Sequence, residues 1–311
     1  MITIGPRWKQ TINPLYPWVA TVNRIFAACQ FPYLFGPTIA LMSDYGGEHR
    51  TSRYDVISIL VFDSEARGEW EHRRRLIRSN ILKDSRRMSF KNLTDRRRKQ
   101  ALLPLLSAAD AITGVCATFV ISKEIKHLCS LPEQFTEFQK HVNLEGSWNS
   151  KSFERVIRLV HFVSLLIAGL SRPKQNVYWI SDEDRFFANT RRSQDVVRLA
   201  SYFTSHYVKH PLGELGIGTT QIDEADRGLE DLTALPDLVA GALAEIAASI
   251  AATYHGRIPM GLALSLPAKL SSKTKVIADW LADDTPSLKR PIITFDLAET
   301  GELGVSRLTL A

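Results

Sequence analysis

The sequence has little cysteine: three residues, Cys29, Cys116 and Cys129, in a chain of 311. Their number is odd, their spacing is not that of a metal site, and each stands among apolar residues, so we expect buried free thiols. No apolar run reaches the roughly 18 residues of a membrane span, and residues 1–10 lack the basic-then-apolar pattern of a secretory signal. These absences predict a soluble, cytoplasmic protein without disulfides.

Motifs of several common enzyme classes are also missing. The sequence has no Gly-x-Ser-x-Gly elbow, so serine hydrolase chemistry has no support. It has no Walker loop and no Gly-x-Gly-x-x-Gly after a strand, the glycine patterns that cradle nucleotide phosphates. His206 and His210 are four residues apart and could bind zinc, but no third ligand accompanies them. Exposed or capping histidines are the better interpretation of that pair.

What the sequence does have is an uneven positive charge. The net charge is +6, the pI is about 9.2, and many of the basic residues lie between Arg73 and Lys99. Such a stretch favours a polyanion, DNA or RNA, because its cations neutralise phosphates and release counterions. A solvated helix face is the alternative. The candidate nucleic-acid-binding residues are Arg73, Arg74, Arg75, Arg78, Arg86, Arg87, Arg96, Arg97 and Arg98.

Hydrophobic periodicity predicts an α/β protein with a mixed sheet flanked by helices. We expect an N-terminal cover segment (1–37), a main domain (38–256) and a C-terminal extension (257–311). The predicted strands are 38–43 and 54–62 as an antiparallel pair, 111–122, 176–180, 216–222, and a final hairpin of 292–297 with 304–310. The predicted helices are 19–29, 65–81 capped by Ser64, 95–109 broken or kinked at Pro104, 152–170, 189–209, 235–254 and 274–281. Residues 88–93 should be extended and 132–149 a loop.

Four acidic residues stand where catalytic groups are usually placed. Asp44 directly follows the first predicted strand, Asp182 and Asp184 follow the strand ending at residue 180, and Asp237 begins a predicted helix. Mg²⁺ and Mn²⁺ prefer oxygen ligands and take few of them from the protein. Two such ions about 4 Å apart activate a water and stabilise the leaving oxygen of a phosphodiester. Each acid also has a structural interpretation, as a turn residue, a cap or a helix-dipole charge.

Several segments together resemble one known family. They are Asp44-Tyr-Gly-Gly47, Ser89-Phe-Lys-Asn-Leu93 before Asp95-Arg-Arg-Arg98, Trp179-Ile-Ser-Asp-Glu-Asp184, and Glu230-Asp-Leu-Thr-Ala-Leu-Pro-Asp-Leu-Val-Ala-Gly241. Over residues 38–251 the chain resembles the bacterial family catalogued as domain of unknown function 3800. That family is regarded as having a ribonuclease H-like fold, so the resemblance implies three antiparallel strands followed by parallel ones.

Carried over by position, the resemblance implies that Asp44 bridges two metal ions, with Asp182 holding one and Asp237 the other. Asp184 is the alternative to Asp182. Ser89-Phe-Lys91 occupies a segment where relatives often carry an acidic residue and a Lys. Lys91 could contact phosphate or orient a water, and a solvated Lys is the alternative. Tyr45 stands where the family usually has Glu, which removes one potential ligand.

The sequence therefore predicts a ribonuclease H-like nuclease that uses Mg²⁺ or Mn²⁺ to hydrolyse nucleic-acid phosphodiesters. The main alternative is a catalytically inactive scaffold that binds nucleic acid or a partner protein, which the substitution at position 45 favours. A third is a phosphatase or nucleotide hydrolase acting on small substrates. The N-terminal cover and the C-terminal hairpin are candidate contact surfaces for a homo-oligomer or a partner protein.

Overall fold

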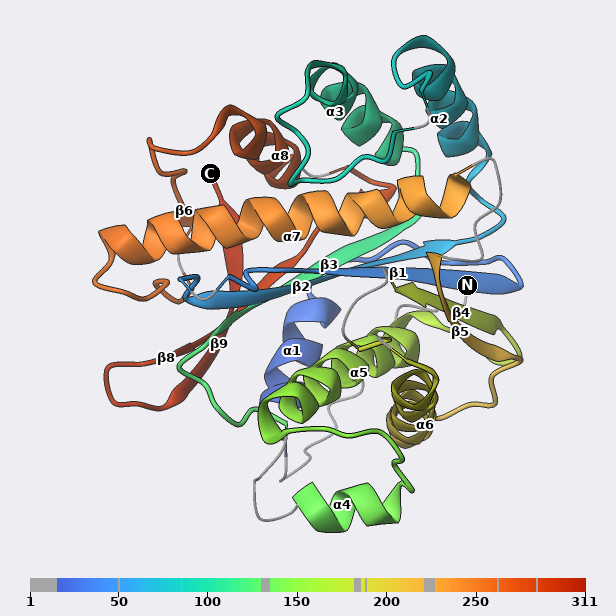
Figure 1. Cartoon of the computed structure of the whole chain (residues 1–311), viewed down its shortest axis with the longest axis vertical. Coiled ribbons are helices and arrows are strands. Elements are labelled where there is room, and N and C mark those ends of the chain that lie inside the picture. Colours follow the sequence, from blue (N-terminus) through green and yellow to red (C-terminus); the bar gives the residue numbers. More distant parts are fainter. Residues whose placement is uncertain are drawn as a thin grey trace.

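The computed structural model describes residues 16–49, 51–84, 86–129, 135–181, 186–187, 189–220, 227–261, 263–283 and 285–311. Within these residues the chain is an α/β protein with a mixed sheet of nine strands flanked by helices (Figure 1). The strands are β1 (Thr38–Gly46), β2 (Tyr54–Asp63), β3 (Gly114–Ser122), β4 (Asn176–Ser181), β5 (Leu215–Thr219), β6 (Ala263–Leu264), β7 (Leu288–Lys289), β8 (Ile292–Leu297) and β9 (Leu303–Leu310). The helices are α1 (Trp18–Ala27), α2 (Gly68–Asn80), α3 (Arg96–Ala109), α4 (Phe135–His141), α5 (Ser150–Leu170), α6 (Thr190–Tyr207), α7 (Gly228–Thr253) and α8 (Ser272–Ala282).

The strand order across the sheet is β5-β4-β1-β2-β3-β8-β9-β6, with β7 also paired to β3. The strands β1, β2 and β3 are successively antiparallel, and β4 and β5 are parallel to β1. This is the order of antiparallel and then parallel strands that the resemblance implied. The final hairpin is also confirmed, since β8 and β9 pair antiparallel, and β8 joins the same sheet beside β3.

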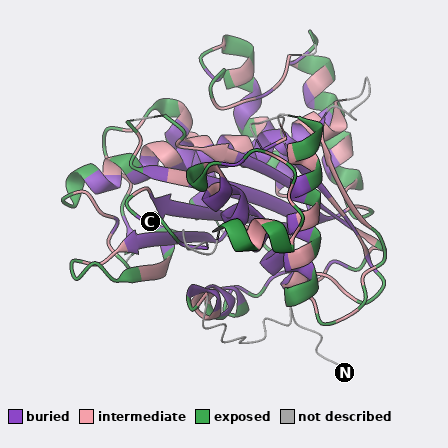
Figure 2. Cartoon of the chain, turned by 60° about the horizontal axis from the view of Figure 1, so that its bottom comes forward, coloured by how far each residue is buried: buried purple, intermediate pink, exposed green. Residues whose placement is uncertain are grey.

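Each face of the sheet is covered by a different set of helices, and each encloses an apolar core. On one face α7 lies against the sheet, with α2, α3 and α8 outside it; α1, α5 and α6 cover the other face (Figure 1). Side chains of a strand alternate between faces, so Ala40 and Met42 of β1 enter the α7 core while Ile39 and Leu41 enter the α5 core. Figure 2 shows the strands buried between these layers.

Helix α7 begins earlier than predicted. The sequence predicted a helix that begins at residue 235, with Pro236 in its first turn. In the structure the helix starts at Gly228 and continues through Pro236. Its first turn carries Glu230 and Asp231, the acidic charges that suit a helix N-terminus. Asp237 therefore lies in the interior of α7 and not at its start.

The same helix bears on the prediction that no apolar run reaches the length of a membrane span. Among the described residues, α7 is the one helix long and apolar enough to do so by length and composition. However, 67% of its most apolar window is buried inside the protein, where it packs against β1, β2 and β3. This burial is consistent with the core helix of a soluble protein.

Several other element boundaries differ from the predictions. β1 continues to Gly46, so that Asp44 lies inside the strand, and α4 occupies part of the predicted loop 132–149. α2 begins at Gly68 and not after Ser64, because the Asp63 carboxylate accepts hydrogen bonds from the next backbone N–H groups and forms a turn there. α3 runs through Pro104 as one helix. Residues 91–93 form a turn, and residues 88–90 belong to no strand.

Candidate metal site and basic surface

Asp44 faces α7 from inside β1. Its strand neighbours on the same face are Met42, which belongs to the α7 core, and Gly46, which packs against α7. The side chain of Asp44 is largely buried, with 8% of the residue exposed. Its Oδ1 accepts a hydrogen bond of 2.5 Å from the backbone N–H of Tyr45, which helps to orient the carboxylate.

Helix α7 brings Asp237 to the same face of the sheet. The Thr233 hydroxyl contacts the sulfur of Met42 at 3.7 Å, and the Ala240 backbone packs against Gly46. Residues 233, 237 and 240 lie on one face of a helix because they are four and three positions apart. Asp237 thus lies between two contacts that bracket Asp44 on β1. The two acids predicted to share a cation therefore lie at the same level of the contact between β1 and α7.

The close approach of α7 to β1 requires glycine at position 46. A Cβ atom there would stand 2.5 Å from the carbonyl oxygen of Ala240 and 2.8 Å from its carbonyl carbon. Both atoms belong to helix backbone, which cannot rotate away as a side chain could. Gly46 therefore sets the distance between the strand that carries Asp44 and the helix that carries Asp237.

We expect the substitution Gly46→Ala to lower the free energy of unfolding by about 1–3 kcal/mol, the usual cost of overpacking. Urea unfolding followed by circular dichroism measures this change. Gly68→Ala is the matched control, because no atom lies within 4 Å of its added Cβ. Alanine favours a helix over glycine by about 1 kcal/mol, so this control should be neutral or stabilising. Equal destabilisation by both substitutions would contradict the close-packing argument.

The segment containing Lys91 is attached to Asp237. The backbone N–H of Phe90 donates to Asp237 Oδ2 at 2.6 Å. The Phe90 ring packs on Gly241, one helical turn further along α7, and Lys273 of α8 places its Nζ 3.7 Å from the ring centroid. Lys91 itself is exposed. The structure thus brings residues 89–93, one of the segments that carry the family resemblance, to Asp237. No local sequence signal indicates this backbone contact.

The remaining acids of the predicted site, Asp182 and Asp184, lie outside the described residues. β4 is described to its last residue, Ser181, which pairs in parallel register with Ser43 of β1. In the described part of the chain, no group of three or more His, Cys, Asp or Glu residues is placed to hold a metal. The described part of the candidate site is therefore the pair Asp44 and Asp237.

Tyr45, which departs from the family motif, points to the opposite face of the sheet. Its hydroxyl contacts the hydroxyls of Ser43 at 3.1 Å and Ser181 at 3.0 Å. Its ring packs edge-on against Phe186, with 5.3 Å between centroids. A carboxylate at this position would leave the sheet on the side away from α7. The tyrosine therefore removes no ligand from the face that carries Asp44.

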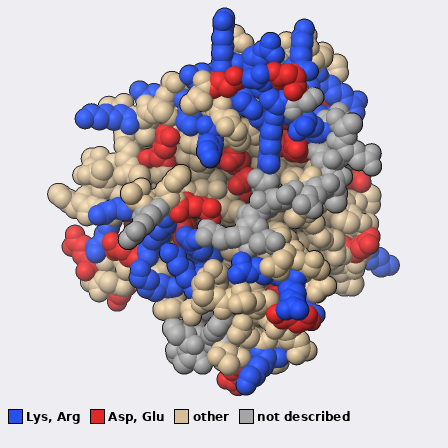
Figure 3. Space-filling view, in the orientation of Figure 1, with Lys and Arg blue, Asp and Glu red and all other residues tan. Residues whose placement is uncertain are grey.

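The predicted basic stretch is divided between exposed and internal residues. Figure 3 shows Lys and Arg side chains gathered at the top of the molecule, over α2 and α3. Arg73, Arg75, Arg96 and Arg97 are exposed there. Arg74 is an exception to the predicted surface, because only 1% of its side chain is exposed. The helix periodicity of α2 turns Arg74 toward α7, next to Trp70 and Ile77 on the buried face.

Most of these cations already have acidic or carbonyl partners. Arg74 and Arg78 both donate to the carboxylate of Asp231 on α7. Arg78 also donates to the carbonyl oxygen of Arg86. Arg86 pairs with Asp84 and Asp95, and Arg97 pairs with Asp84 at 3.0 Å. Further pairs are Arg73 with Glu69, and Arg98 with the carbonyl oxygen of Arg87. The exposed surface is still basic, although part of its charge is neutralised internally.

The chain was compared with models of known protein families and with curated proteins, and neither comparison finds a match. The resemblance to the domain of unknown function 3800 family therefore stays a prediction that rests on the quoted motifs.

Proposed function

We propose that this protein has a ribonuclease H-like fold and is a Mg²⁺- or Mn²⁺-dependent nuclease acting on nucleic-acid phosphodiesters in the cytoplasm. The observation that supports the proposal is the packing of α7, which carries Asp237, against β1, which carries Asp44. The strand order β3-β2-β1-β4-β5, antiparallel and then parallel, supports the fold assignment. Asp44 is buried on β1, and Asp237 is half-buried on the helix that packs on this strand.

The chemistry of the two side chains fits a hard divalent cation. Carboxylate oxygens are the ligands that Mg²⁺ and Mn²⁺ prefer, and each carboxylate is oriented by one backbone N–H, from Tyr45 and Phe90. Such outer contacts commonly hold metal ligands in position. Asp44 and Asp237 would hold the ion, and we propose Asp182 or Asp184 as a further ligand. A bound ion would acidify its water and neutralise phosphodiester charge.

The helices that carry the basic residues adjoin the segment that is hydrogen-bonded to Asp237. α2 and α3 flank residues 86–93, and Phe90 of that segment is hydrogen-bonded to Asp237. The exposed arginines of these helices and Lys91 therefore belong to elements that adjoin the acid pair. Phosphate contacts by such residues position a strand without reading its sequence. We propose that this surface guides the polynucleotide backbone to Asp44 and Asp237.

The test is cleavage of labelled DNA and RNA in Mg²⁺ or Mn²⁺ by the wild type, Asp44→Asn and Asp237→Asn. We expect each substitution to reduce the cleavage rate by more than about 100-fold, the upper end of what loss of an outer metal-site partner costs. In Asp237→Asn the amide oxygen of the new side chain can still accept from the N–H of Phe90, so the fold should persist. Asp279→Asn, an exposed acid on α8, is the control and should cleave normally.

A different outcome would favour the scaffold function. Both carboxylates also have structural partners, since Asp44 binds the N–H of Tyr45 and Asp237 holds the Phe90 segment. If the wild type and both variants cut equally, or if none cuts, these acids serve the fold alone. Salt-sensitive binding to long polynucleotides without cleavage would then identify a nucleic-acid-binding scaffold, and weak salt dependence would indicate a small substrate.

A further inference from the structure

A cavity of about 520 Å³ opens beside the start of β2 and the end of β3, on the α5 side of the sheet. Its volume is in the range of sites for small ligands, about 300–1,000 Å³. Five cationic side chains line it, from the β3–α4 connection and from the start of α5: Lys123, Lys126, Lys151, Arg155 and Arg158. Ile125 is the one apolar residue in its described lining. The positive charge of this lining suits an anionic ligand.

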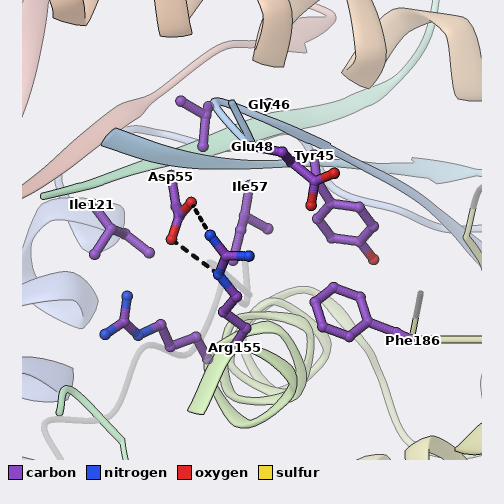
Figure 4. Close-up of a pocket in the computed structure, with 10 residues that line it drawn as sticks. Tyr45, Gly46, Glu48, Asp55, Ile57, Ile121, Arg155 and Phe186 are labelled. Atoms are coloured by element: carbon purple, nitrogen blue, oxygen red, sulfur yellow. Dashed lines mark hydrogen bonds and ion pairs between the residues drawn. The ribbon is translucent and has the colours of Figure 1, made fainter. Parts of the chain in front are cut away.

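The two carboxylates in the lining do not balance this charge. Asp55 pairs with Arg155 at 2.6 Å (Figure 4). The same carboxylate also lies 3.7 Å from the Nζ of Lys123. Glu154 pairs with Arg158 at 2.7 Å and also accepts from two backbone N–H groups of residues 128 and 129. Five cations and two carboxylates leave an excess of three positive charges. Burial lowers the pKa of Lys123, and the neighbouring Arg155 and Lys151 lower it further against the effect of Asp55.

Arg158 is a buried part of the cavity wall, and hydrogen bonds hold its side chain in place. It is 4% exposed, its Nε donates to Glu154, and its Nη2 donates to the carbonyl oxygen of Ile125 at 2.7 Å. These bonds fasten the segment that carries Lys123 and Lys126 to α5. The other terminal nitrogen, Nη1, has no hydrogen-bond partner among the described residues. A guanidinium nitrogen without a protein partner is a donor for an incoming acceptor.

The start of α5 adds further donors. Ser150 and Lys151, the first two residues of this 21-residue helix, belong to the lining. Backbone N–H groups at a helix N-terminus lack intrahelical acceptors and carry partial positive charge, which favours anions. Phosphate oxygens bind well at such ends. Buried guanidinium, exposed ammonium and helix N-terminus thus offer donors to one anionic group.

We propose that this cavity binds phosphate groups, either of a free di- or triphosphate or of a nucleic-acid backbone. It lies across the sheet from Asp44, and it does not depend on a metal bound there. An adjoining pocket lined by Tyr45, Glu48 and Phe186 shares Asp55 and Arg155 with it (Figure 4). Lys123 also donates to the carbonyl oxygens of Gly47, at 2.5 Å, and His49. The cavity and the acid pair therefore flank the same end of β1.

Calorimetric titration with pyrophosphate and with a short single-stranded oligonucleotide tests the proposal. The variant Lys126→Glu/Lys151→Glu changes two exposed lining residues and leaves the buried pair Glu154–Arg158 intact. We expect it to weaken binding by about tenfold or more, since each lost phosphate contact lowers an electrostatic affinity. The control Lys269→Glu/Lys275→Glu makes the same charge change at exposed residues outside the cavity and should bind nearly as the wild type does.

The two probes separate the sources of phosphate. Pyrophosphate that binds and displaces the oligonucleotide indicates a site for phosphate groups in general, and binding of the oligonucleotide alone indicates a strand. No binding of either probe, or equal weakening by the two double variants, overturns the proposal. The variant Asp44→Asn/Asp237→Asn should bind pyrophosphate as the wild type does. Failure of the nuclease proposal would therefore leave this result unchanged.

Discussion

Replacement of Asp231 by alanine is expected to lower the free energy of unfolding by about 3–5 kcal/mol, the cost of breaking a buried ion pair by removing one partner. Asp231 and Arg74 are both 1% exposed. The carboxylate accepts from Arg74 Nη1 at 3.3 Å and from Arg78 Nε at 2.9 Å, and Arg78 Nη2 also donates to it. Without the Asp231 carboxylate, the buried guanidinium of Arg74 keeps Glu71 as its acidic partner. The ion pairs of Arg74 and Arg78 that join α2 to α7 are then lost.

Two further variants test the cause of this loss. Glu69→Ala removes the exposed partner of Arg73 on the same helix, where the side chains are 47% and 56% exposed, and should cost no more than about 1 kcal/mol. The double substitution Arg74→Met with Asp231→Leu removes both buried charges and should recover much of the stability. Urea unfolding gives all three values. A cost for Asp231→Ala as small as that for Glu69→Ala would refute the buried-pair argument.

This pair also affects how binding experiments on the basic stretch are interpreted. Arg74 and Arg78 were predicted from the sequence to contact nucleic acid, yet both bind Asp231 inside the protein. A weaker affinity in an Arg74 variant would reflect a displaced α2 and not a lost phosphate contact. Substitutions at the exposed Arg75 and Arg96 are the appropriate tests of that surface.

Acid is expected to destabilise this protein through His161. The imidazole lies inside an aromatic cluster, 4.0 Å from the Phe203 ring and 4.4 Å from the Tyr16 ring by centroids. Its Nδ1 contacts the Tyr207 hydroxyl at 3.0 Å, while its buried Nε2 has no partner among the described residues. Burial lowers the pKa of His161 to about 3, and the charge of His206 contributes in the same direction. The folded state therefore holds this histidine neutral far below its ordinary pKa of about 6.5.

The sign of the pH dependence follows from proton binding in the two states. Between about pH 6.5 and pH 3 the unfolded chain protonates His161 and the folded protein does not, so stability falls as the pH falls. The slope from this one group approaches about 1.4 kcal/mol per pH unit. At about pH 4 its loss would reach roughly 3 kcal/mol relative to neutral pH.

Chemical unfolding of the wild type and His161→Phe, at neutral pH and at about pH 4, measures this contribution. The phenylalanine suits the aromatic cluster and cannot be protonated, so the variant should lose less stability in acid than the wild type. His72→Gln, at an exposed position of α2, is the control and should follow the wild type. Carboxylates also titrate in this range, and the difference between variants isolates His161. An identical acid loss in wild type and His161→Phe would contradict the prediction.

Local sequence pattern was sufficient for much of the fold and for nominating part of the site. Apolar runs rich in β-branched residues identified β1, β2 and β3, and the pairing of β8 with β9 followed from their separation by a short turn. Boundaries were less well predicted. The start of α7 was predicted too late, because a proline such as Pro236 is typical of the first turn of a helix. In the structure, burial of α7 against the sheet outweighs the cost of one lost backbone hydrogen bond at Pro236.

The sequence by itself determined the α/β class, the order of most elements and the acidic residues worth testing, because these depend on neighbours along the chain. Only the tertiary structure decided that the helix of Asp237 packs on the strand of Asp44, that Arg74 is internal, and that Lys123, Lys151 and Arg155 line one cavity. Those outcomes depend on which surfaces pack together. Packing is set by contacts between residues far apart in the chain, and no local pattern records them.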